Sequence, residues 1–333
     1  MKITIKTIVA KHNNLFLLEQ TMEILNEHYV TAWVLEHPAH FQLLAPFIRN
    51  GSVDDLLIVT KRIECMNMYN NSQNYLPIRE TIFVERPFGK NMTKIQTILT
   101  MIKRRNKVIK VLKSRQKTNP IERIIVMGAS LELFSARTAK IPQRIYISDT
   151  EIHHLAHKLA LKSATHALLP TYWREDLDNN FLKKCAKRNI NIIRHNKIHA
   201  EMRNYSKNTI RNKKIICRKL QGGGSHDKNE ILAIDDALNL ITQEIDFFNE
   251  DLEHNNPWEL CNLISNYTAA ITQSTTFAAE ASIQNIPTLL ISKAERGFLS
   301  ELNLRNAPLI QCNSVEELKY KFEKWYDFLI NCR

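Results

Sequence analysis

The chain has 333 residues, of which 44% are hydrophobic and 24% charged, and its formal net charge is +12. These proportions are typical of a folded protein long enough for two domains, and they argue against long disordered tracts. No apolar run approaches the roughly 20 residues of a membrane span, and the first residues show no signal-peptide cleavage pattern, so we expect a cytoplasmic protein. The positive charge favours anionic partners, such as nucleotides, nucleic acid or an anionic membrane surface.

Short apolar runs alternate with helical stretches along the whole chain and indicate two series of strands. The first series is expected at 32–35, 56–59, 81–84, 123–127, 144–147 and 167–169, and the second at 191–193, 214–218, 244–247, 269–271, 287–291 and 308–311. Alternation of strands and helices predicts parallel sheets with right-handed crossovers. We place the boundary near Pro170, which predicts an N-terminal domain at 1–171 and a C-terminal domain at 172–333.

The six cysteines are scattered and form no C-x-x-C pair. In a chain of this length they indicate reduced thiols rather than a disulfide framework or a zinc site. The sequence also has no D-x-D motif before a strand end that could hold a metal ion, and we expect neither a bound metal nor a cofactor.

The first candidate site follows the first predicted strand, which ends at Glu36. Pro38 suits the first turn of a helix, so His37 and His40, three residues apart, can share one helix face. A histidine at a strand end is a suitable general base near neutral pH. The alternative is a capping or hydrogen-bonded pair, and these residues alone leave both interpretations open.

Residues 94–117 contain nine lysines and arginines and no acidic residue. Apolar residues at helical spacing within this stretch predict an amphipathic helix; they are Ile95, Ile98, Leu99, Ile102, Ile109 and Leu112. The favoured interpretation is a solvated basic face above an apolar core stripe. The alternative is contact with anionic lipid headgroups or with a phosphorylated acceptor.

Another strand, in the stretch 145–160, ends in Ser148, Asp149, Thr150 and Glu151. Asp149 and Glu151 are candidate catalytic carboxylates. Alternatively, Ser148 or Asp149 caps the next helix and the helix dipole favours Glu151. His153, His154 and His157 do not match a zinc motif, and we interpret them as structural or solvent-facing.

The stretch 215–230 runs from a strand through Arg218 and Lys219 into a glycine cluster that includes Gly222 and Gly223, followed by His226. Glycines let the backbone approach a ligand closely. The G-K-[ST] ending of a phosphate-binding P-loop is missing, so an ATPase is excluded. A flexible loop is the other interpretation.

The stretch 269–292 reads as strand, hydroxyl cluster, helix and strand. Ser274, Thr275 and Thr276 stand where the helix begins, and free N–H groups at a helix start can bind a diphosphate. One of these hydroxyls can instead simply cap the helix. If Thr276 is the cap, Glu280 lies one position too late for a capping box, which favours a ligand such as ribose hydroxyls.

Three segments, H-P-A-H-F, S-D-T-E-I and A-E-A-S-I-Q-N-I-P-T-L, resemble an uncharacterised epimerase-like GT-B family over residues 32–312. Relatives of this family include UDP-N-acetylglucosamine 2-epimerases and nucleotide-sugar glycosyltransferases. The resemblance implies an α/β GT-B fold: two Rossmann-like domains whose parallel sheets face an interdomain cleft. It places Ser274, Thr275 and Thr276 on the diphosphate, Glu280 on the ribose or sugar, and His37 and His40 at the cleft. This chain has Gln273, Ser274 and Asn285 where the family usually has glycines.

These observations together predict a metal-independent glycosyltransferase that uses a nucleotide-sugar, with a UDP-sugar as the first expectation, and a surface glycan or lipid-linked acceptor. His40, or else Asp149 or Glu151, would act as the base, and Arg218, Lys219 and the helix start at 274–277 would stabilise the leaving diphosphate. His37, Gly222, Gly223 and His226 would complete the substrate site. Residues 94–117 would allow peripheral binding to the inner face of the membrane.

Three alternatives remain beside this hypothesis. A sugar-nucleotide 2-epimerase would need a carboxylate-rich site to remove a proton from C2. A non-catalytic GT-B scaffold is compatible with the missing glycines. A nucleic-acid-binding protein is compatible with the charge, but the sequence contains no aromatic-rich RNA-binding signature, zinc finger or basic zipper, so we expect no nucleic-acid partner.

Overall fold

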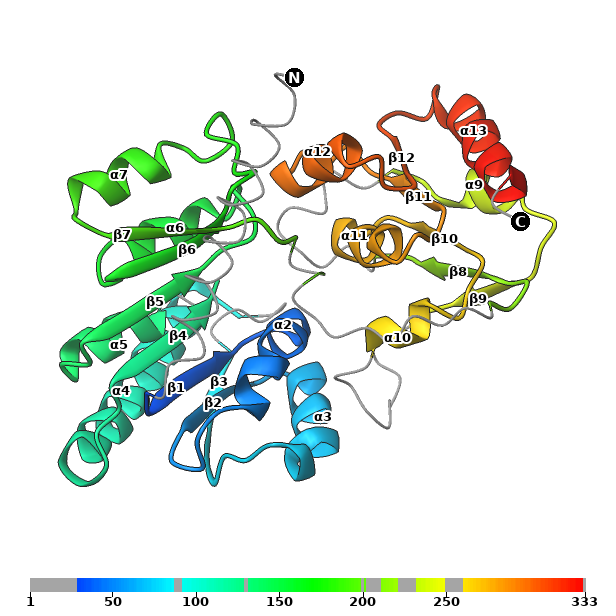
Figure 1. Ribbon diagram of the computed structural model, residues 1–333. Coiled ribbons are helices and arrows are strands. Elements are labelled where there is room, and N and C mark those ends of the chain that lie inside the picture. Colours follow the sequence, from blue (N-terminus) through cyan, green and yellow to red (C-terminus); the bar gives the residue numbers. More distant parts are fainter. Residues whose placement is uncertain are drawn as a thin grey trace, which may run out of the picture. The chain divides into compact units, whose positions relative to one another are not determined.

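The computed structural model describes residues 29–86, 92–128, 131–198, 201, 211–220, 232–248 and 260–331. The chain divides into two compact units (Figure 1). Unit 1 is Met1–Lys197 and unit 2 is Ile198–Arg333.

Unit 1 is built on a parallel sheet of seven strands in the order β3-β2-β1-β4-β5-β6-β7. The strands are β1 (Thr31–Leu35), β2 (Leu56–Lys61), β3 (Glu80–Glu85), β4 (Arg123–Met127), β5 (Gln143–Ile147), β6 (His166–Pro170) and β7 (Asn191–His195). The helices are α2 (Pro38–Arg49), α3 (Ile63–Ser72), the 3-10 helix η1 (Gln73–Tyr75), α4 (Lys94–Thr118), α5 (Leu131–Thr138), α6 (His154–Ala160) and α7 (Phe181–Lys187).

Helices cover both faces of this sheet, which explains why its central strands are apolar throughout. On one face, alternate residues such as Ala32 and Val34 of β1 pack with α4, α5, α6 and α7. Figure 1 shows α2 and α3 on the opposite side of the sheet from α4 and α5. Right-handed crossovers require this arrangement, because the chain first proceeds from β1 to β3 and then reverses from β4 to β7.

Unit 2 is built on a second parallel sheet, in the order β12-β11-β10-β8-β9. Its strands are β8 (Ile215–Arg218), β9 (Ile245–Phe247), β10 (Ala269–Thr272), β11 (Thr288–Ile291) and β12 (Leu309–Cys312), and its helices are α9 (Asp235–Leu238), α10 (Leu260–Ile264), α11 (Thr275–Ile283), α12 (Gly297–Leu304) and α13 (Leu318–Asn331). One face packs against α13 through its buried Phe322 and Trp325, and the other against α11 through Phe277 and Ala281.

All twelve predicted strands are present, and the α/β class with parallel sheets is confirmed. The division between the units, however, falls after Lys197 and not at residue 171. The reason is that Asn191–His195 pairs with β6 in the sheet of unit 1. The polar stretch near Pro170, which suggested a linker, is a turn inside that unit: the Thr171 N–H donates to the His195 carbonyl at 2.7 Å.

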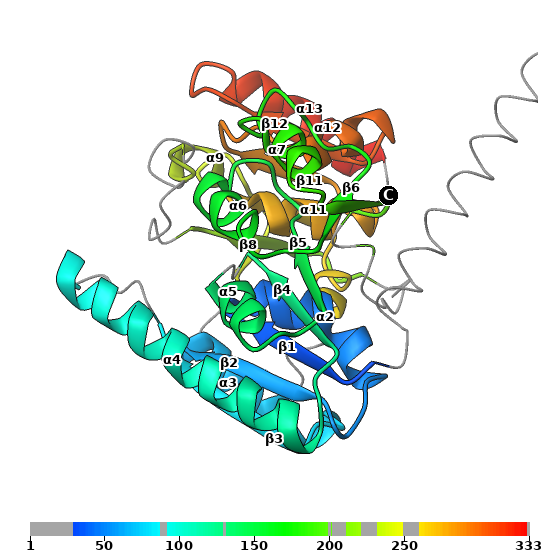
Figure 2. The same ribbon diagram turned by 90° about the vertical axis from the view of Figure 1, so that its left-hand side faces the viewer.

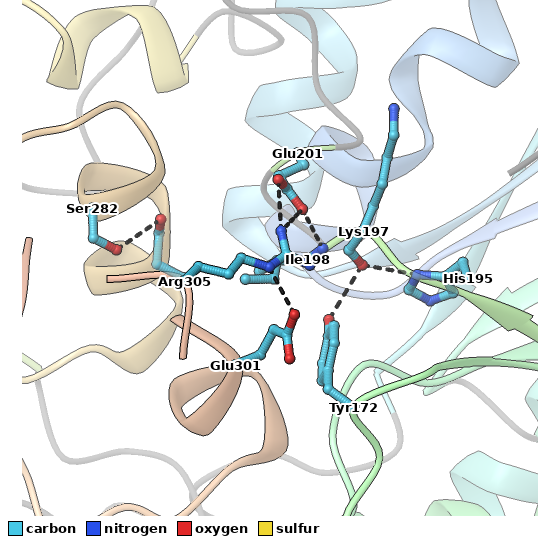
Figure 3. Close-up of polar contacts among 9 residues, drawn as sticks. Tyr172, His195, Lys197, Ile198, Glu201, Ser282, Glu301 and Arg305 are labelled. Atoms are coloured by element: carbon cyan, nitrogen blue, oxygen red, sulfur yellow. Dashed lines mark hydrogen bonds and ion pairs between the residues drawn. The ribbon is translucent and has the colours of Figure 1, made fainter. Parts of the chain in front are cut away.

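The chain on each side of the junction is held by its own unit (Figure 3). In unit 1 the Lys197 carbonyl oxygen lies 2.8 Å from His195 Nδ1 and accepts a hydrogen bond from the Tyr172 hydroxyl at 3.3 Å. In unit 2 Glu201 accepts from the Ile198 N–H at 2.7 Å and binds Arg305 at 2.9 Å.

Helix α4 differs from the expectation. Its residues Ile95, Ile98 and Leu99 are more than half exposed and do not form a core stripe. The helix packs instead through Arg104, Val108 and Leu112, all three fully buried. Among the described residues, no helix combines the length and the hydropathy that crossing a membrane requires.

Candidate functional site

In an open parallel sheet, ligands bind beyond the carboxyl ends of the strands, at the place where the strand order reverses. In unit 1 this place lies between β1 and β4, and in unit 2 between β8 and β10. Glu36 and Gly128 directly follow β1 and β4, whereas Lys219 and Gln273 directly follow β8 and β10. The predicted site residues near positions 37–40, 218–219 and 273–276 therefore cluster at the two reversal points.

His37 is the N-cap of α2. Its Nδ1 accepts a hydrogen bond from the Ala39 N–H at 3.2 Å, and Pro38 occupies the first turn. The capping interpretation of His37 is thus the one that the structure shows. The ring centroids of His37 and His40 lie 5.9 Å apart, so the two histidines are neighbours.

His40 lies beside Gly128, the residue that directly follows β4. A Cβ added to Gly128 would come within 3.7 Å of His40 Nε2, and the φ of +68° at Gly128 also favours glycine. His40 Nδ1 accepts a hydrogen bond from the Glu36 N–H at 3.3 Å. Burial, followed by the nearby His37 and His153, holds the pKa of His40 well below its usual value. His40 is therefore neutral near pH 7.

A neutral imidazole that accepts a hydrogen bond at Nδ1 carries its proton on Nε2. His40 Nε2 is consequently a hydrogen-bond donor. To accept a proton there, the ring would have to move its own proton to Nδ1 and lose the bond from Glu36. The hydrogen bonding thus does not support the expectation that His40 is the base.

A buried ionic cluster lies under the same edge of the sheet, and sequence reasoning missed it. Arg104 Nε binds Glu132 Oε1 at 2.5 Å, and Arg104 Nη1 lies 3.4 Å from Glu36 Oε1 and 3.1 Å from the Glu85 carbonyl oxygen. Arg104 and Glu132 are each 1% exposed, whereas the Glu36 side chain is 28% exposed. Glu132 thus holds Arg104 in place, and Arg104 in turn holds the partly exposed Glu36 carboxylate at the reversal point.

Burial raises the pKa of the Glu36 carboxyl, although Arg104 opposes this effect. A carboxylate with a raised pKa accepts protons more readily than an ordinary one. One signal in the sequence pointed to this cluster, namely an acidic residue directly after a strand. Position 104 gave none, because Ile102 was expected in the core stripe and an arginine two positions away was then expected in solvent. Residues two positions apart lie on nearly opposite helix faces.

The stretch after β5 has a mainly structural role. Glu151 is fully buried and accepts a hydrogen bond from the Arg174 N–H at 3.0 Å, which fixes the turn after β6. Ser148 donates to the Thr150 carbonyl oxygen at 2.9 Å and contacts His157 Nε2 at 3.2 Å. Neither Ser148 nor Asp149 caps a helix, because α6 begins only at His154. Asp149 is half-buried at this edge of the sheet.

In unit 2, Ser274 is the N-cap of α11. Its hydroxyl accepts from the Phe277 N–H at 3.3 Å, and its own N–H donates to Thr272 Oγ1 at 2.9 Å. The helix starts before Thr276, so Thr276 is not the cap. Thr275 and Thr276 lie half-buried in the first turn, and Glu280 is buried one turn beyond Thr276.

The end of β8 lies against the start of α11. The Arg218 carbonyl oxygen accepts from the Gln273 N–H at 3.2 Å and from the Thr272 hydroxyl at 3.0 Å. The Arg218 guanidinium lies 5.7 Å and 5.9 Å from the ring centroids of Phe277 and Phe248. Lys219 instead binds Asp235 at 2.6 Å, so part of its charge is compensated.

Gln273 bridges two segments beside this helix start. Its side chain accepts from the Leu220 N–H at 3.0 Å and donates to the Leu232 carbonyl oxygen at 2.6 Å. Gly222, Gly223 and His226 lie outside the described residues, in the segment that Leu220 and Leu232 flank. Within the described part of the chain, no three histidine, cysteine or acidic residues gather as they would around a metal ion.

The chain matches no protein-family model and no curated protein. Several solved structures are similar to it over most of their length. UDP-GlcNAc 2-epimerase from Methanocaldococcus jannaschii has 16% identity and a TM-score of 0.58, and the match covers 90% of this chain and 92% of the other. UDP-GlcNAc 2-epimerase from Neisseria meningitidis, bound to UDP-GlcNAc, has 12% identity and a TM-score of 0.56, with 90% and 92% covered.

A glycosyltransferase is similar to the same extent. Spinosyn forosaminyltransferase has 10% identity and a TM-score of 0.54, and the match covers 92% of this chain and 93% of the other. These likenesses show that the chain has the GT-B fold, with two Rossmann-like domains, that 2-epimerases and glycosyltransferases share.

Proposed function

We propose that this protein is a nucleotide-sugar enzyme and that it transfers the sugar to an acceptor hydroxyl. The observation that carries the proposal is the reversal point of unit 2, where Arg218 and the Ser274-capped start of α11 lie side by side. A helix start beside a cation is suited to a diphosphate, which both parts stabilise. The Neisseria meningitidis structure, which has this fold, is bound to UDP-GlcNAc, so a UDP-sugar is the first donor to test.

The donor would lie on unit 2. N–H groups of the first turn of α11 and the hydroxyls of Thr275 and Thr276 would bind the diphosphate, and Arg218 would balance its charge. Glu280 would bind the ribose or sugar hydroxyls. As the bond between the anomeric carbon and the diphosphate oxygen breaks, negative charge develops on that oxygen, and these donors stabilise it without a metal ion.

The acceptor hydroxyl would be activated by unit 1. Its oxygen attacks the anomeric carbon, and its proton goes to a nearby base. We assign this base to Glu36, because its carboxylate is partly exposed at the reversal point and held by Arg104. His40 would donate a hydrogen bond from Nε2, and Asp149 is the competing base. The proposed acceptor is a surface glycan or a lipid-linked glycan.

A UDP-N-acetylhexosamine 2-epimerase is the second candidate. It is favoured by the 2-epimerases among the similar structures and by two acidic residues, Glu36 and Asp149, at the carboxyl edge of one sheet. Removal of the C2 proton requires a carboxylate or a similar base in that position. A non-catalytic scaffold is the third, because Gln273 and Ser274 stand where the family that the sequence resembles usually has glycines.

Calorimetric titration with UDP, GDP and CMP tests the donor site directly. We expect one of them to bind, and Arg218→Met to weaken that binding at least tenfold while the melting temperature changes little. If the protein is folded and binds none of the three nucleotides, the non-catalytic scaffold is favoured. If one binds, incubation of the matching sugar nucleotide with and without glycan acceptors separates transfer from epimerisation: free nucleotide forms in the first case and the 2-epimer in the second.

A further inference from the structure

Helix α4 carries an exposed apolar surface that the described residues of unit 1 leave uncovered. Ile95, Ile98, Leu99 and Ile102 are 71%, 56%, 51% and 42% exposed. Their spacing of three and four residues places them on one face of the helix. Figure 2 shows the first turns of α4 extending beyond the strands of unit 1. We name this set the α4 apolar stripe.

The α4 apolar stripe is not a displaced core face. The helix packs on its sheet through Arg104, Val108 and Leu112, which are fully buried. At 3.6 residues per turn, Ile95 and Ile102 point to the side opposite Arg104, and Ile98 and Leu99 lie on either side of them. A surface helix of a monomeric protein normally has polar residues on that side. Contiguous exposed apolar side chains indicate a binding surface.

Lysines continue the same face and border the stripe. Lys103 follows Leu99 by one turn, and Lys110 and Lys113 occupy the outward face two to three turns further along; all three are exposed. The helix contains no acidic residue. Two of its three arginines form ion pairs within the unit: Arg104 binds Glu132, and Arg115 binds Glu80. The third, Arg105, lies over the Phe134 ring at 5.7 Å. The outward charge of α4 is therefore mainly that of its exposed lysines.

We propose that the α4 apolar stripe and Lys103, Lys110 and Lys113 form a docking surface for an anionic phospholipid membrane. Apolar side chains followed by lysines on one helix face are the arrangement that interfacial helices use: the apolar part enters the acyl boundary and the lysines meet the headgroups. A second copy of the chain is a poorer occupant. Contact through α4 would bring together two lysine-rich helices that contain no acidic residue, and like charges repel across an interface.

The surface lies entirely on unit 1 and contains no residue of the proposed donor site. Membrane docking is therefore independent of the proposed function and can be tested separately. It would give the enzyme access to a lipid-linked acceptor, if the acceptor is of that kind.

Flotation with lipid vesicles tests the proposal. At low salt the protein should float with an equimolar mixture of phosphatidylcholine and phosphatidylglycerol but not with phosphatidylcholine alone. Lys110→Gln/Lys113→Gln should weaken this binding by about thirtyfold, because each lysine near an anionic surface contributes a factor of about five. Ile95→Ser/Ile98→Ser should remove the part of the binding that persists at high salt, where charge attraction is screened.

Two control pairs match these variants in charge and exposure. Lys183→Gln/Lys187→Gln removes two exposed lysines from α7, and Leu155→Ser/Leu304→Ser removes two exposed apolar side chains of 63% and 78% exposure. Neither control should change vesicle binding. The proposal fails if the protein does not bind the anionic vesicles, or if the controls weaken binding as much as the α4 variants. It also fails if the parent protein does not bind vesicles but forms a dimer in analytical ultracentrifugation, and Ile95→Ser/Ile98→Ser abolishes that dimer.

Calorimetric nucleotide titration of the same variants keeps this test separate from the donor site. Unchanged nucleotide affinity with lost vesicle binding supports docking. Unchanged vesicle binding in every α4 variant refutes it, whatever the nucleotide result.

Discussion

Arg104 and Glu132 form an ion pair of 2.5 Å in which each side chain is 1% exposed. The pair joins α4 to α5, two helices on the same face of the unit 1 sheet, and it extends to Glu36 at the end of β1. Within the described residues, Arg104 Nη2 and Glu132 Oε2 have no hydrogen-bond partner. Buried charges are costly, so each partner depends strongly on the other.

Arg104→Ala should therefore destabilise unit 1 by about 3–5 kcal/mol, because it leaves Glu132 buried and unpaired. The double variant Arg104→Met/Glu132→Leu should lose less than the single variant, since it removes both charges. Urea unfolding followed by circular dichroism measures both. Arg105→Ala, one position along, should cost below about 1 kcal/mol because that side chain is only half-buried. Equal losses for Arg104→Ala and the double variant would contradict this account.

The stability of the folded protein should also decrease as the pH is lowered, because of His157. Burial, assisted by His153 and His154, lowers the pKa of His157 from 6.5 to about 3. Between these values the unfolded chain binds a proton that the folded protein does not, so stability is lost as the pH falls from 6.5 toward 3. His40 acts in the same direction.

His157→Gln removes the titrating group and keeps a polar side chain at this position. Between pH 5 and 6, the slope of unfolding free energy against pH should be smaller than in the parent protein by about 1.4 kcal/mol per pH unit. His154→Gln, at an exposed position, serves as the control and should leave the slope as it is. Identical slopes in all three proteins would show that His157 is not held neutral.

The three hydroxyl side chains at the start of α11 should have different roles. Ser274 should act as the helix cap, and Thr275 and Thr276 should bind the nucleotide. Ser274→Ala should lower stability by about 1 kcal/mol, because it removes the acceptor of the Phe277 N–H. Thr275→Val and Thr276→Val should leave stability nearly unchanged and weaken nucleotide binding. Thermal unfolding and calorimetric titration of the three variants provide the two readouts. If both threonine variants bind nucleotide like the parent, the diphosphate is not held by this helix start.

The base of the proposed transfer can be assigned by comparing four variants. Glu36→Gln should lower turnover by about 10²–10⁴ while donor binding persists, as expected for loss of a general base. His40→Ala should have a smaller effect, because its Nε2 is a donor, and Glu151→Gln should act mainly on stability. Steady-state kinetics with titrated donor binding distinguishes these cases. Should Asp149→Asn remove turnover and Glu36→Gln spare it, the base follows β5 and not β1.

The sequence alone predicted the strands, because a buried parallel strand requires a run of apolar residues that is visible locally. It also indicated the regions of both reversal points, since polar residues directly after such runs lie at the carboxyl edge of a sheet. The domain boundary was misplaced for a related reason. The polar turn after Pro170 resembles a linker, and only the pairing of β6 with β7 shows that the chain returns to the same sheet.

Roles within the site depended on contacts between distant parts of the chain. Arg104 is 28 residues from Glu132 and 68 from Glu36 in sequence, so no local pattern could pair them. Position 104 reads as one more charge of a basic helix, and only its orientation toward the sheet makes it a buried partner. The same rotation of α4 turns Ile95, Ile98 and Leu99 outward. Periodicity shows that a helix has a face, whereas packing against the rest of the protein decides which face is buried.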